Sequence, residues 1–360
     1  MRKAGLPVYH PVTLDREYLA GKAMDAFGKR YPGSWRTTSA SRKMRVLEEF
    51  RDLISSLEES LAMDNPAVFI DHACWAKVHL TALHFPKNHV SHVLDVLGEV
   101  LAKELPPDFR EPAGTMITES SAVLKNVSPD VPSPITPDNP LSDSAGSFLT
   151  ALLGADRERA GKILDDAVRS GTPVKDLYLR ILQPVLEETG RLWQLQQVSI
   201  AQEHFVTASV ETLMVRLHDR FLPSGGAGRE RRGTTLVAAG VGADLHSVGI
   251  RMVADFFEMD GWDTFCTGAN TPATSILEAA RDRKADVIAL SATMPRHLPD
   301  VRYLIRSLRA DRGTARATII VGGYPFRLVP GLWKQIGADA FAGTAEEAVA
   351  VADRLVPERR

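Results

Sequence analysis

Residues 235–249 read TLVAAGVGADLHSVG, and this stretch decides the fold of the C-terminal part of the chain. An apolar run over Thr235–Ala239 has the length of a buried strand, and the loop after it leads into a helix-like segment that starts near Val248. Four further apolar runs alternate with helix-like segments; they are Asp263–Thr267, Val287–Ser291, Thr318–Val321 and Ala338–Ala342. This alternation predicts an α/β domain over residues 234–360, with a doubly wound five-stranded parallel sheet of Rossmann-like type.

The loop after the first predicted strand carries Asp244, His246 and Gly249 in the order Asp-x-His-x-x-Gly. Ligands of doubly wound sheets bind at the carboxyl ends of the strands, where this loop lies. A neutral imidazole is a good ligand for borderline metals. A carboxylate two residues away can accept a hydrogen bond from the other ring nitrogen and fix the tautomer. The pattern therefore predicts a metal-binding histidine, and the alternative is an ordinary loop histidine in a flavodoxin-like fold.

Asp-x-His-x-x-Gly in this place resembles the cobalamin-binding domains of methionine synthase and of the mutases that bind cobalamin through a histidine. Ser291-Ala292-Thr293 at the end of the third strand and Gly322-Gly323 at the end of the fourth fit the same family. The resemblance implies that His246 is the lower axial ligand of cobalt and that the glycines leave room for the nucleotide tail. The site residues it implies in this domain are Asp244, Leu245, His246, Ser247, Gly249, Ser291, Thr293, Gly322 and Gly323.

Residues 145–222 are expected to form a four-helix bundle. The predicted helices lie around Phe148–Leu153 and over Arg157–Arg169, Val174–Gln194 and Ser199–Leu217. Short turns between them, such as Gly171-Thr172-Pro173, imply antiparallel neighbours.

The bundle holds Trp193, then nine residues, then Glu203-His204, with Val198 in between. This spacing resembles the light-sensing family that binds adenosylcobalamin. The resemblance implies adenosylcobalamin as the cofactor, with Trp193, Val198 and Glu203 as cap residues over its upper face. It implies His204 as the upper ligand after light breaks the Co–C bond. The alternatives are a core aromatic for Trp193 and a solvated helix face for Glu203 and His204.

The first part of the chain, residues 1–105, is expected to be helical. Apolar residues recur at helical spacing over Arg42–Met63 and again over Asn88–Glu104. Residues 106–144 hold eight prolines among Ser, Asp and Thr, which is typical of a linker. A second linker, rich in Gly and Arg, is predicted over 223–233.

Residues 69–107 resemble bacterial sensor-globin domains, through Trp75-Ala76-Lys77 and His84-Phe85-Pro86. His72 and His79 lie two turns apart on the face that carries Trp75. Joined to a cobalamin module, such a domain looks like the photocobilins, which pair cobalamin with a linear tetrapyrrole such as biliverdin. His72, Trp75, His79 and His84 are then the candidate bilin-binding residues. A haem site and an empty helical dimerisation domain are the alternatives.

Composition sets further limits. The net charge of −2 and the absence of a basic recognition helix argue against direct DNA binding. Two cysteines are too few for a disulfide framework, and neither a signal peptide nor a membrane-spanning run is visible, so a cytoplasmic protein is expected.

These observations together favour a light sensor rather than an enzyme. Photolysis of the Co–C bond would change the arrangement of domains or of a homo-oligomer and signal to an unknown downstream protein. The alternative is a corrinoid protein that carries methyl groups for a methyltransferase system.

Overall fold

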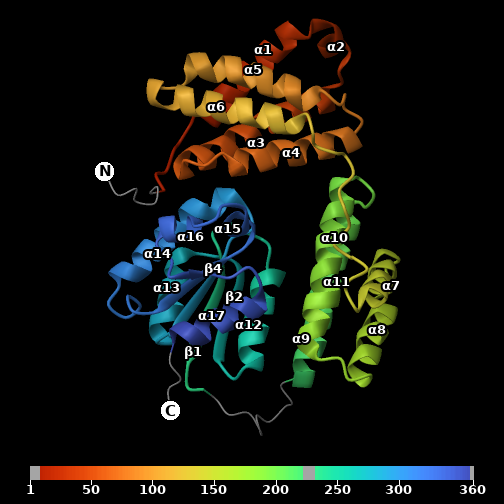
Figure 1. Ribbon diagram of the computed structural model, residues 1–360, viewed down its shortest axis with the longest axis vertical. Helices are drawn as coiled ribbons and strands as arrows, with labels where there is room; N and C mark the ends of the chain where they lie inside the picture. The colour runs from red at the N-terminus through yellow and green to blue at the C-terminus, as the bar shows by residue number, and fades with distance from the viewer. Residues whose placement is uncertain (1–8, 222–231, 357–360) are drawn as a thin grey trace.

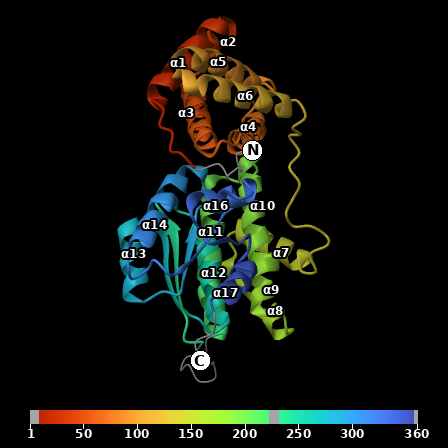
Figure 2. The same ribbon diagram turned by 60° about the vertical axis from the view of Figure 1, so that its left-hand side comes forward.

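The computed structural model describes residues 9–221 and 232–356, so most of the predicted second linker lies outside the described residues. The chain forms three parts: an N-terminal helical domain, a helical bundle and a C-terminal α/β domain (Figures 1 and 2). The bundle stands beside the α/β domain, and the N-terminal domain lies across the same end of both (Figure 1). In the part of the chain that is described, no helix is both long and apolar enough to cross a membrane.

The α/β domain contains the predicted parallel sheet, and its strand order is β2-β1-β3-β4-β5. The strands are β1 (Thr235–Val241), β2 (Asp263–Thr271), β3 (Val287–Ser291), β4 (Thr318–Gly322) and β5 (Ala340–Phe341). The helices are α12 (Val248–Met259), α13 (Ala273–Asp282), α14 (Leu298–Ala310), α15 (Tyr324–Leu328), α16 (Leu332–Ile336) and α17 (Ala345–Leu355). The order reverses between β1 and β3, so the loop after β1 lies at the switch point, where such sheets bind ligands.

Strand β1 shows why the sheet is covered on both faces. Leu236 and Ala238 belong to one apolar core, whereas Val237, Ala239 and Val241 belong to the other. Successive side chains of a strand point to opposite faces, so a strand buried on both faces is a continuous apolar run. The first core also includes residues of α12, α17 and the bundle, and the second includes residues of α13, α14 and α16.

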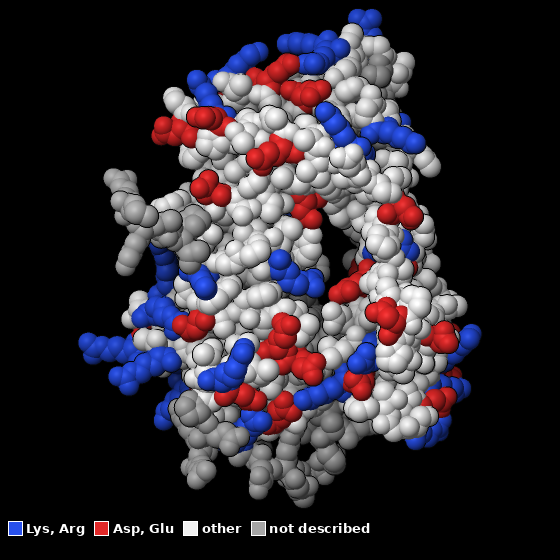
Figure 3. All heavy atoms as spheres, in the orientation of Figure 1, with Lys and Arg blue, Asp and Glu red and all other residues white. Residues whose placement is uncertain are grey.

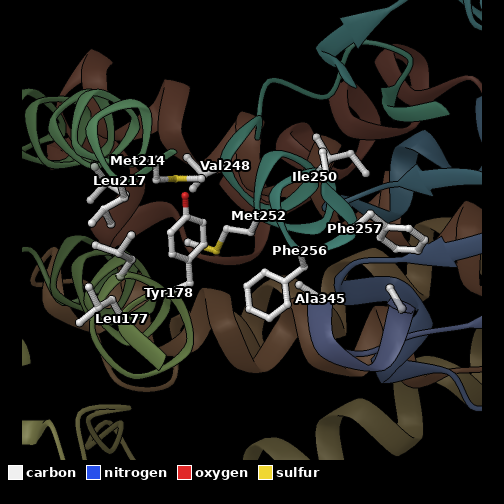
Figure 4. Packing of buried hydrophobic residues seen from close by; sticks show 14 of the residues in the cluster. Leu177, Tyr178, Met214, Leu217, Val248, Ile250, Met252, Phe256, Phe257 and Ala345 are labelled. Carbon is white, nitrogen blue, oxygen red and sulfur yellow. The ribbon is translucent and has the colours of Figure 1, made fainter. Parts of the chain in front are cut away.

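The predicted four-helix bundle is confirmed. Its elements are α7 (Ser142–Leu153), α8 (Arg157–Arg169), the continuous α9 (Val174–Leu177), η1 (Tyr178–Leu182) and α10 (Gln183–Gln194), and α11 (Ile200–Phe221). Element η1 is a π-helical turn that ends two residues before Pro184, which has no N–H for the α-helical ladder. Figure 4 shows Tyr178, Met214 and Leu217 of the bundle facing Val248 and Met252 of α12 in one apolar cluster.

The N-terminal part is helical, as predicted. It consists of α1 (Arg16–Arg30), α2 (Pro32–Thr37), α3 (Ala40–Met63), α4 (Ala67–Ala82), α5 (His89–Glu104) and α6 (Pro107–Leu124). Its own apolar core includes Phe50, Leu53, Phe69, Leu94 and Leu97, all inaccessible to solvent.

The prediction of a linker over residues 106–144 is wrong for α6. Ala113, Met116, Ile117 and Leu124 are buried at helical spacing and pack into the N-terminal core. Pro107 is tolerated because the first helical position needs no N–H partner. Proline content therefore overestimated the linker, which runs from residue 125 to residue 141.

Candidate functional site

The loop after β1 holds His246 in a fixed orientation. Its Nδ1 donates a 2.7 Å hydrogen bond to Asp244 Oδ1, and its backbone N–H donates to the same oxygen at 3.1 Å. The other carboxylate oxygen of Asp244 accepts a 2.5 Å hydrogen bond from the backbone N–H of Thr293, which follows β3. The side chain of Asp244 is 1% exposed and that of His246 is 60% exposed. A buried carboxylate thus anchors an imidazole whose Nε2 has no hydrogen bond to any described residue.

The electrostatics of the pair follow from these bonds. Burial by itself would raise the pKa of Asp244, but hydrogen bonds from the His246 ring and from the N–H groups of Thr293 and His246 hold that pKa well below its usual range. The hydrogen bond to Asp244 raises the pKa of His246, and partial burial opposes this rise. The carboxylate therefore stays ionised and makes the imidazole more basic, which strengthens it as a metal ligand.

A cavity of about 250 Å³ lies beside this loop, between the bundle and the carboxyl ends of the strands. Ser291, Thr293, Gly322 and Gly323 lie along it, with residues of η1, α10, α12 and the start of α17. Gly323 has a φ of +107°, and a Cβ there would lie 2.0 Å from the carbonyl oxygen of Ala292. Only glycine fits this turn, because the backbone after β4 lies directly against the backbone after β3 at the edge of the cavity.

The described residues fit a large planar ligand with a central metal ion. Figure 3 shows an opening between the α/β domain and helices α10 and α11, below the N-terminal domain. Leu245 is 75% exposed beside His246, so an apolar surface lies next to the exposed imidazole. Gly249, one turn further on in α12, lines the cavity and has open space where a Cβ would point.

The bundle residues singled out from the sequence lie at one side of this site. Glu203, in the first turn of α11, is near enough to raise the pKa of His246. His204 has a largely exposed ring whose Nδ1 donates to Glu203 Oε2 at 2.5 Å. Val198 is buried in the turn before α11. The hydroxyl of Ser247 donates to Glu211 of α11, a further link between the site loop and the bundle.

Trp193 and the N-terminal histidines meet in one aromatic cluster. The ring of Trp193 lies 5.5 Å from that of His79 and 6.0 Å from that of Trp75, between centroids. His72 stacks on the other side of Trp75 at 6.2 Å. Nδ1 of His79 lies 3.0 Å from the carbonyl oxygen of Gln194. The structure thus brings His72, Trp75 and His79 together, whereas His84 is exposed beyond the end of α4 and outside the cluster.

Sequence reasoning missed Arg296 and His297, which follow β3. His297 is buried, and its Nδ1 lies 3.5 Å from Asp244 Oδ2. Arg296 is near enough to His246 to lower its pKa, against the effect of Asp244. Both residues follow the Ser291-Ala292-Thr293 segment by three residues or more. Because loops after neighbouring parallel strands lie at one edge of the sheet, this position could have placed them near His246.

Comparison with known proteins agrees with this geometry. Residues 234–352 match the family model described as B12 binding domain, and residues 145–218 match a second model with the same description. Dimethylamine corrinoid protein 1 of Methanosarcina acetivorans is 32% identical over 173 residues, which are 48% of this chain and 76% of that protein. Dimethylamine corrinoid protein 3 of the same organism is 27% identical over 207 residues, 57% of this chain and 93% of that protein.

The chain belongs to the corrinoid protein family. The fold agrees: the solved structure of the monomethylamine corrinoid protein of Methanosarcina barkeri aligns with a TM-score of 0.52 at 18% identity, over 60% of this chain and all of that one. This corrinoid protein therefore has both parts of a B12-binding module, the bundle and the α/β domain.

The prediction of a light sensor is wrong, because the relatives carry the names of methylamine corrinoid proteins. Bilin binding, a light-driven role for His204 and a downstream signalling partner were inferred from that resemblance and fall with it. The Trp-to-Glu-His spacing misled because a short spacing within a bundle does not fix what the side chains contact. In this corrinoid protein Trp193 packs on Trp75 and His79 of the N-terminal domain.

Proposed function

We propose that this protein carries a methyl group on a bound cobalamin, and that a methyltransferase partner loads or unloads it. The observation that carries the proposal is the His246–Asp244 pair at the switch point of the sheet. The names of the relatives, dimethylamine corrinoid proteins, support the methyl-carrier role. In this role the chain is a carrier and not a catalyst by itself.

His246 would hold the cobalt through Nε2, because Nδ1 is engaged by Asp244. When bound, the corrin supplies a metal centre that accepts and releases a methyl group. The hydrogen bond to Asp244 holds the ring proton on Nδ1 and orients the imidazole, which leaves Nε2 to bind the metal, and the backbone N–H of Thr293 keeps Asp244 in place. Ser291, Gly322 and Gly323 would line the cavity that takes the nucleotide tail.

The remaining site residues would enclose the ligand. Leu245, Ser247 and Gly249 would contact it from the α/β domain. Trp193, Val198, Glu203 and His204 would form the wall on the bundle side, with Glu203 and His204 as its polar part.

The test starts from cobalamin binding. The full chain is titrated with methylcobalamin, adenosylcobalamin and aquocobalamin, and the visible spectrum reports whether an imidazole has replaced the nucleotide base. We expect His246→Ala to lose this spectral change and to bind at least about tenfold more weakly, because a direct metal ligand is missing. His84→Ala, an exposed histidine outside the site, is the matched control.

Methyl transfer is then measured with a methylamine-dependent methyltransferase and a methyl acceptor. Transfer that requires His246 supports the carrier role. If the protein binds the corrin tightly but neither accepts nor donates a methyl group, it binds cobalamin and the methyl-carrier function is contradicted.

A further inference from the structure

The N-terminal domain lies outside the part of the chain that matches the B12-binding models and the solved corrinoid protein. The B12-binding models begin at residue 145, and 60% of this chain already covers the whole of the solved monomethylamine corrinoid protein. Helices α1–α6 therefore belong to an addition to the methyl-carrier module. An added domain with its own apolar core needs a role that the module alone does not supply.

This domain lies over the opening of the cobalt site. It rests on the α/β domain at one end of the α3–α4 pair and on the bundle at the other, so the pair bridges the opening seen in Figure 3. Asp52 of α3 and Arg296 of the site loop influence each other electrostatically, and Arg296 also influences His246. Helix α3 therefore lies close to the charged residues around His246, the proposed cobalt ligand.

The contacts differ along this interface. At the α/β end Tyr9, Ala62, Met63 and Val68 share an apolar core with residues of α14 and α16, and the Arg302 guanidinium lies 5.1 Å from the Tyr9 ring centre. This apolar end suits a lasting attachment.

The other interdomain contacts of α4 are with α15 of the α/β domain and with α10 of the bundle, where Trp193 lies against Trp75 and His79. The Tyr324 hydroxyl donates a 2.7 Å hydrogen bond to Asp71, and Gln194 Nε2 donates a 3.2 Å hydrogen bond to the carbonyl oxygen of Trp75. Asp71 and Tyr324 are partly exposed, so water can replace their bond at little cost. The apolar core around Met63 would then act as the hinge, and the contacts of α4 with α15 and α10 would act as the latch.

We infer that residues 9–124 form a lid over the cobalt site, latched by Asp71–Tyr324 and by Gln194, and that the lid must open before a protein partner can reach the cobalt. The inference rests on the proposed function. His246 reaches the metal from the α/β domain, so a partner's substrate has to enter between the α/β domain and the bundle, through the opening that the lid bridges.

The tether allows such a movement. Residues 125–141 connect α6 to α7 without a helix or strand, and 17 residues can span about 55 Å when extended. Its contacts with the bundle are local: Val131 accepts a hydrogen bond from Arg191, Asn139 donates one to the carbonyl oxygen of Arg180, and Ile135 and Leu141 pack against the core that includes the bundle. The lid can therefore leave the opening while the chain stays intact.

The test uses the full chain with Asp71→Ala and Gln194→Ala combined. Asp95→Ala with Gln197→Ala is the matched control, since both side chains are exposed and have no assigned bond across the interface. Small-angle scattering without cofactor reports opening, and cyanide exchange on the aquocobalamin-loaded protein reports access to the cobalt. We expect the latch variant to have a larger radius of gyration and at least about tenfold faster exchange, because two interdomain hydrogen bonds are lost.

An unchanged radius and an unchanged exchange rate in the folded latch variant would overturn the lid, and so would a larger radius without faster exchange. If the double variant does not fold, Gln194→Ala alone serves the same test with an expected increase of about fivefold. Different results would contradict the two proposals. If the latch variant opens but no methyl group is transferred, the methyl-carrier function is contradicted and the lid is not. If the latch variant transfers methyl groups at the rate of the unchanged protein, only the lid is contradicted.

Discussion

Tyr178 of the bundle donates a 2.7 Å hydrogen bond to Asp255 of the α/β domain, and both side chains are buried. Asp255 also accepts a hydrogen bond from Arg251 at 3.1 Å, so its charge is compensated within α12. Figure 4 shows the Tyr178 hydroxyl between Met214 of the bundle and Met252 of α12. One polar bond inside an apolar cluster therefore fixes how the two halves of the B12-binding module pack together.

Replacement of Tyr178 by phenylalanine tests this bond. Tyr178→Phe keeps the ring packing but leaves a buried carboxylate oxygen without its partner, so we expect a loss of about 1–3 kcal/mol of stability. Urea unfolding followed by circular dichroism measures it. Tyr303→Phe, at a tyrosine that is 62% exposed, should change stability by less than about 0.5 kcal/mol. Equal effects of the two substitutions would show that the bond contributes nothing specific.

Replacement of Asp244 by asparagine separates the support of the ligand from the ligand itself. Asp244→Asn keeps the shape of the side chain but removes the charge that makes His246 more basic, so cobalamin affinity should fall about 10–100-fold. The imidazole signature in the visible spectrum should weaken without disappearing. Asp282→Asn, at the exposed end of α13, is the control. Full affinity in Asp244→Asn would show that the hydrogen bond plays no part in holding the metal.

Two glycines of the cavity should behave differently when changed to alanine. Gly323→Ala places a Cβ 2.0 Å from the Ala292 carbonyl oxygen at a φ of +107°, so it should destabilise the protein without cofactor by several kcal/mol. Gly249→Ala has open space inside α12 and should leave that stability unchanged or raise it by about 0.5–1 kcal/mol. If Gly249 faces the corrin, its alanine variant should nevertheless bind cobalamin more weakly. Thermal unfolding without cofactor measures the stability of both variants, and titration with cobalamin measures their affinity.

Much of the α/β domain and the bundle could be predicted because each element carries its own signal. Apolar runs of strand length gave β3 its bounds, Val287–Ser291, and helical spacing gave those of α8, Arg157–Arg169. His246 could be chosen because its position after the first strand, and not only its neighbours in sequence, points to the ligand-binding edge.

The rest depends on contacts between segments far apart in sequence. Nothing near Asp71 predicts its bond to Tyr324, 253 residues later, and nothing near Trp193 predicts that His79 packs on it. The choice between sensor and carrier depended on a short spacing in the bundle, which does not show how the cofactor is used. Local pattern identifies the cofactor class here, whereas the choice of a protein partner depends on the assembled surface.

Glu49 makes the stability of the N-terminal domain depend on pH. Its side chain is 6% exposed, Oε1 has no hydrogen-bond partner among the described residues, and burial raises its pKa from 4.5 to about 8. The folded state therefore keeps a proton that the unfolded chain releases above pH 4.5. Because the native state binds more protons, stability falls as pH rises from 4.5 to about 8, by at most about 1.4 kcal/mol per pH unit.

Comparison of two variants between pH 7 and pH 8 isolates this effect. Burial raises the pKa of Glu59 to about 7, so this carboxyl still loses its proton within the window, and it contributes equally to the slopes of both variants. Burial lowers the pKa of His72 and His89 to about 4, so their contributions, which raise stability with pH, end near the ordinary histidine value of about 6.5. Glu49→Gln should flatten the fall of stability between pH 7 and 8, whereas Glu48→Gln, one position along and exposed, should leave it. Denaturation of both variants at pH 7 and 8 measures the slopes, and an unaltered slope in Glu49→Gln would assign the pH dependence to another group.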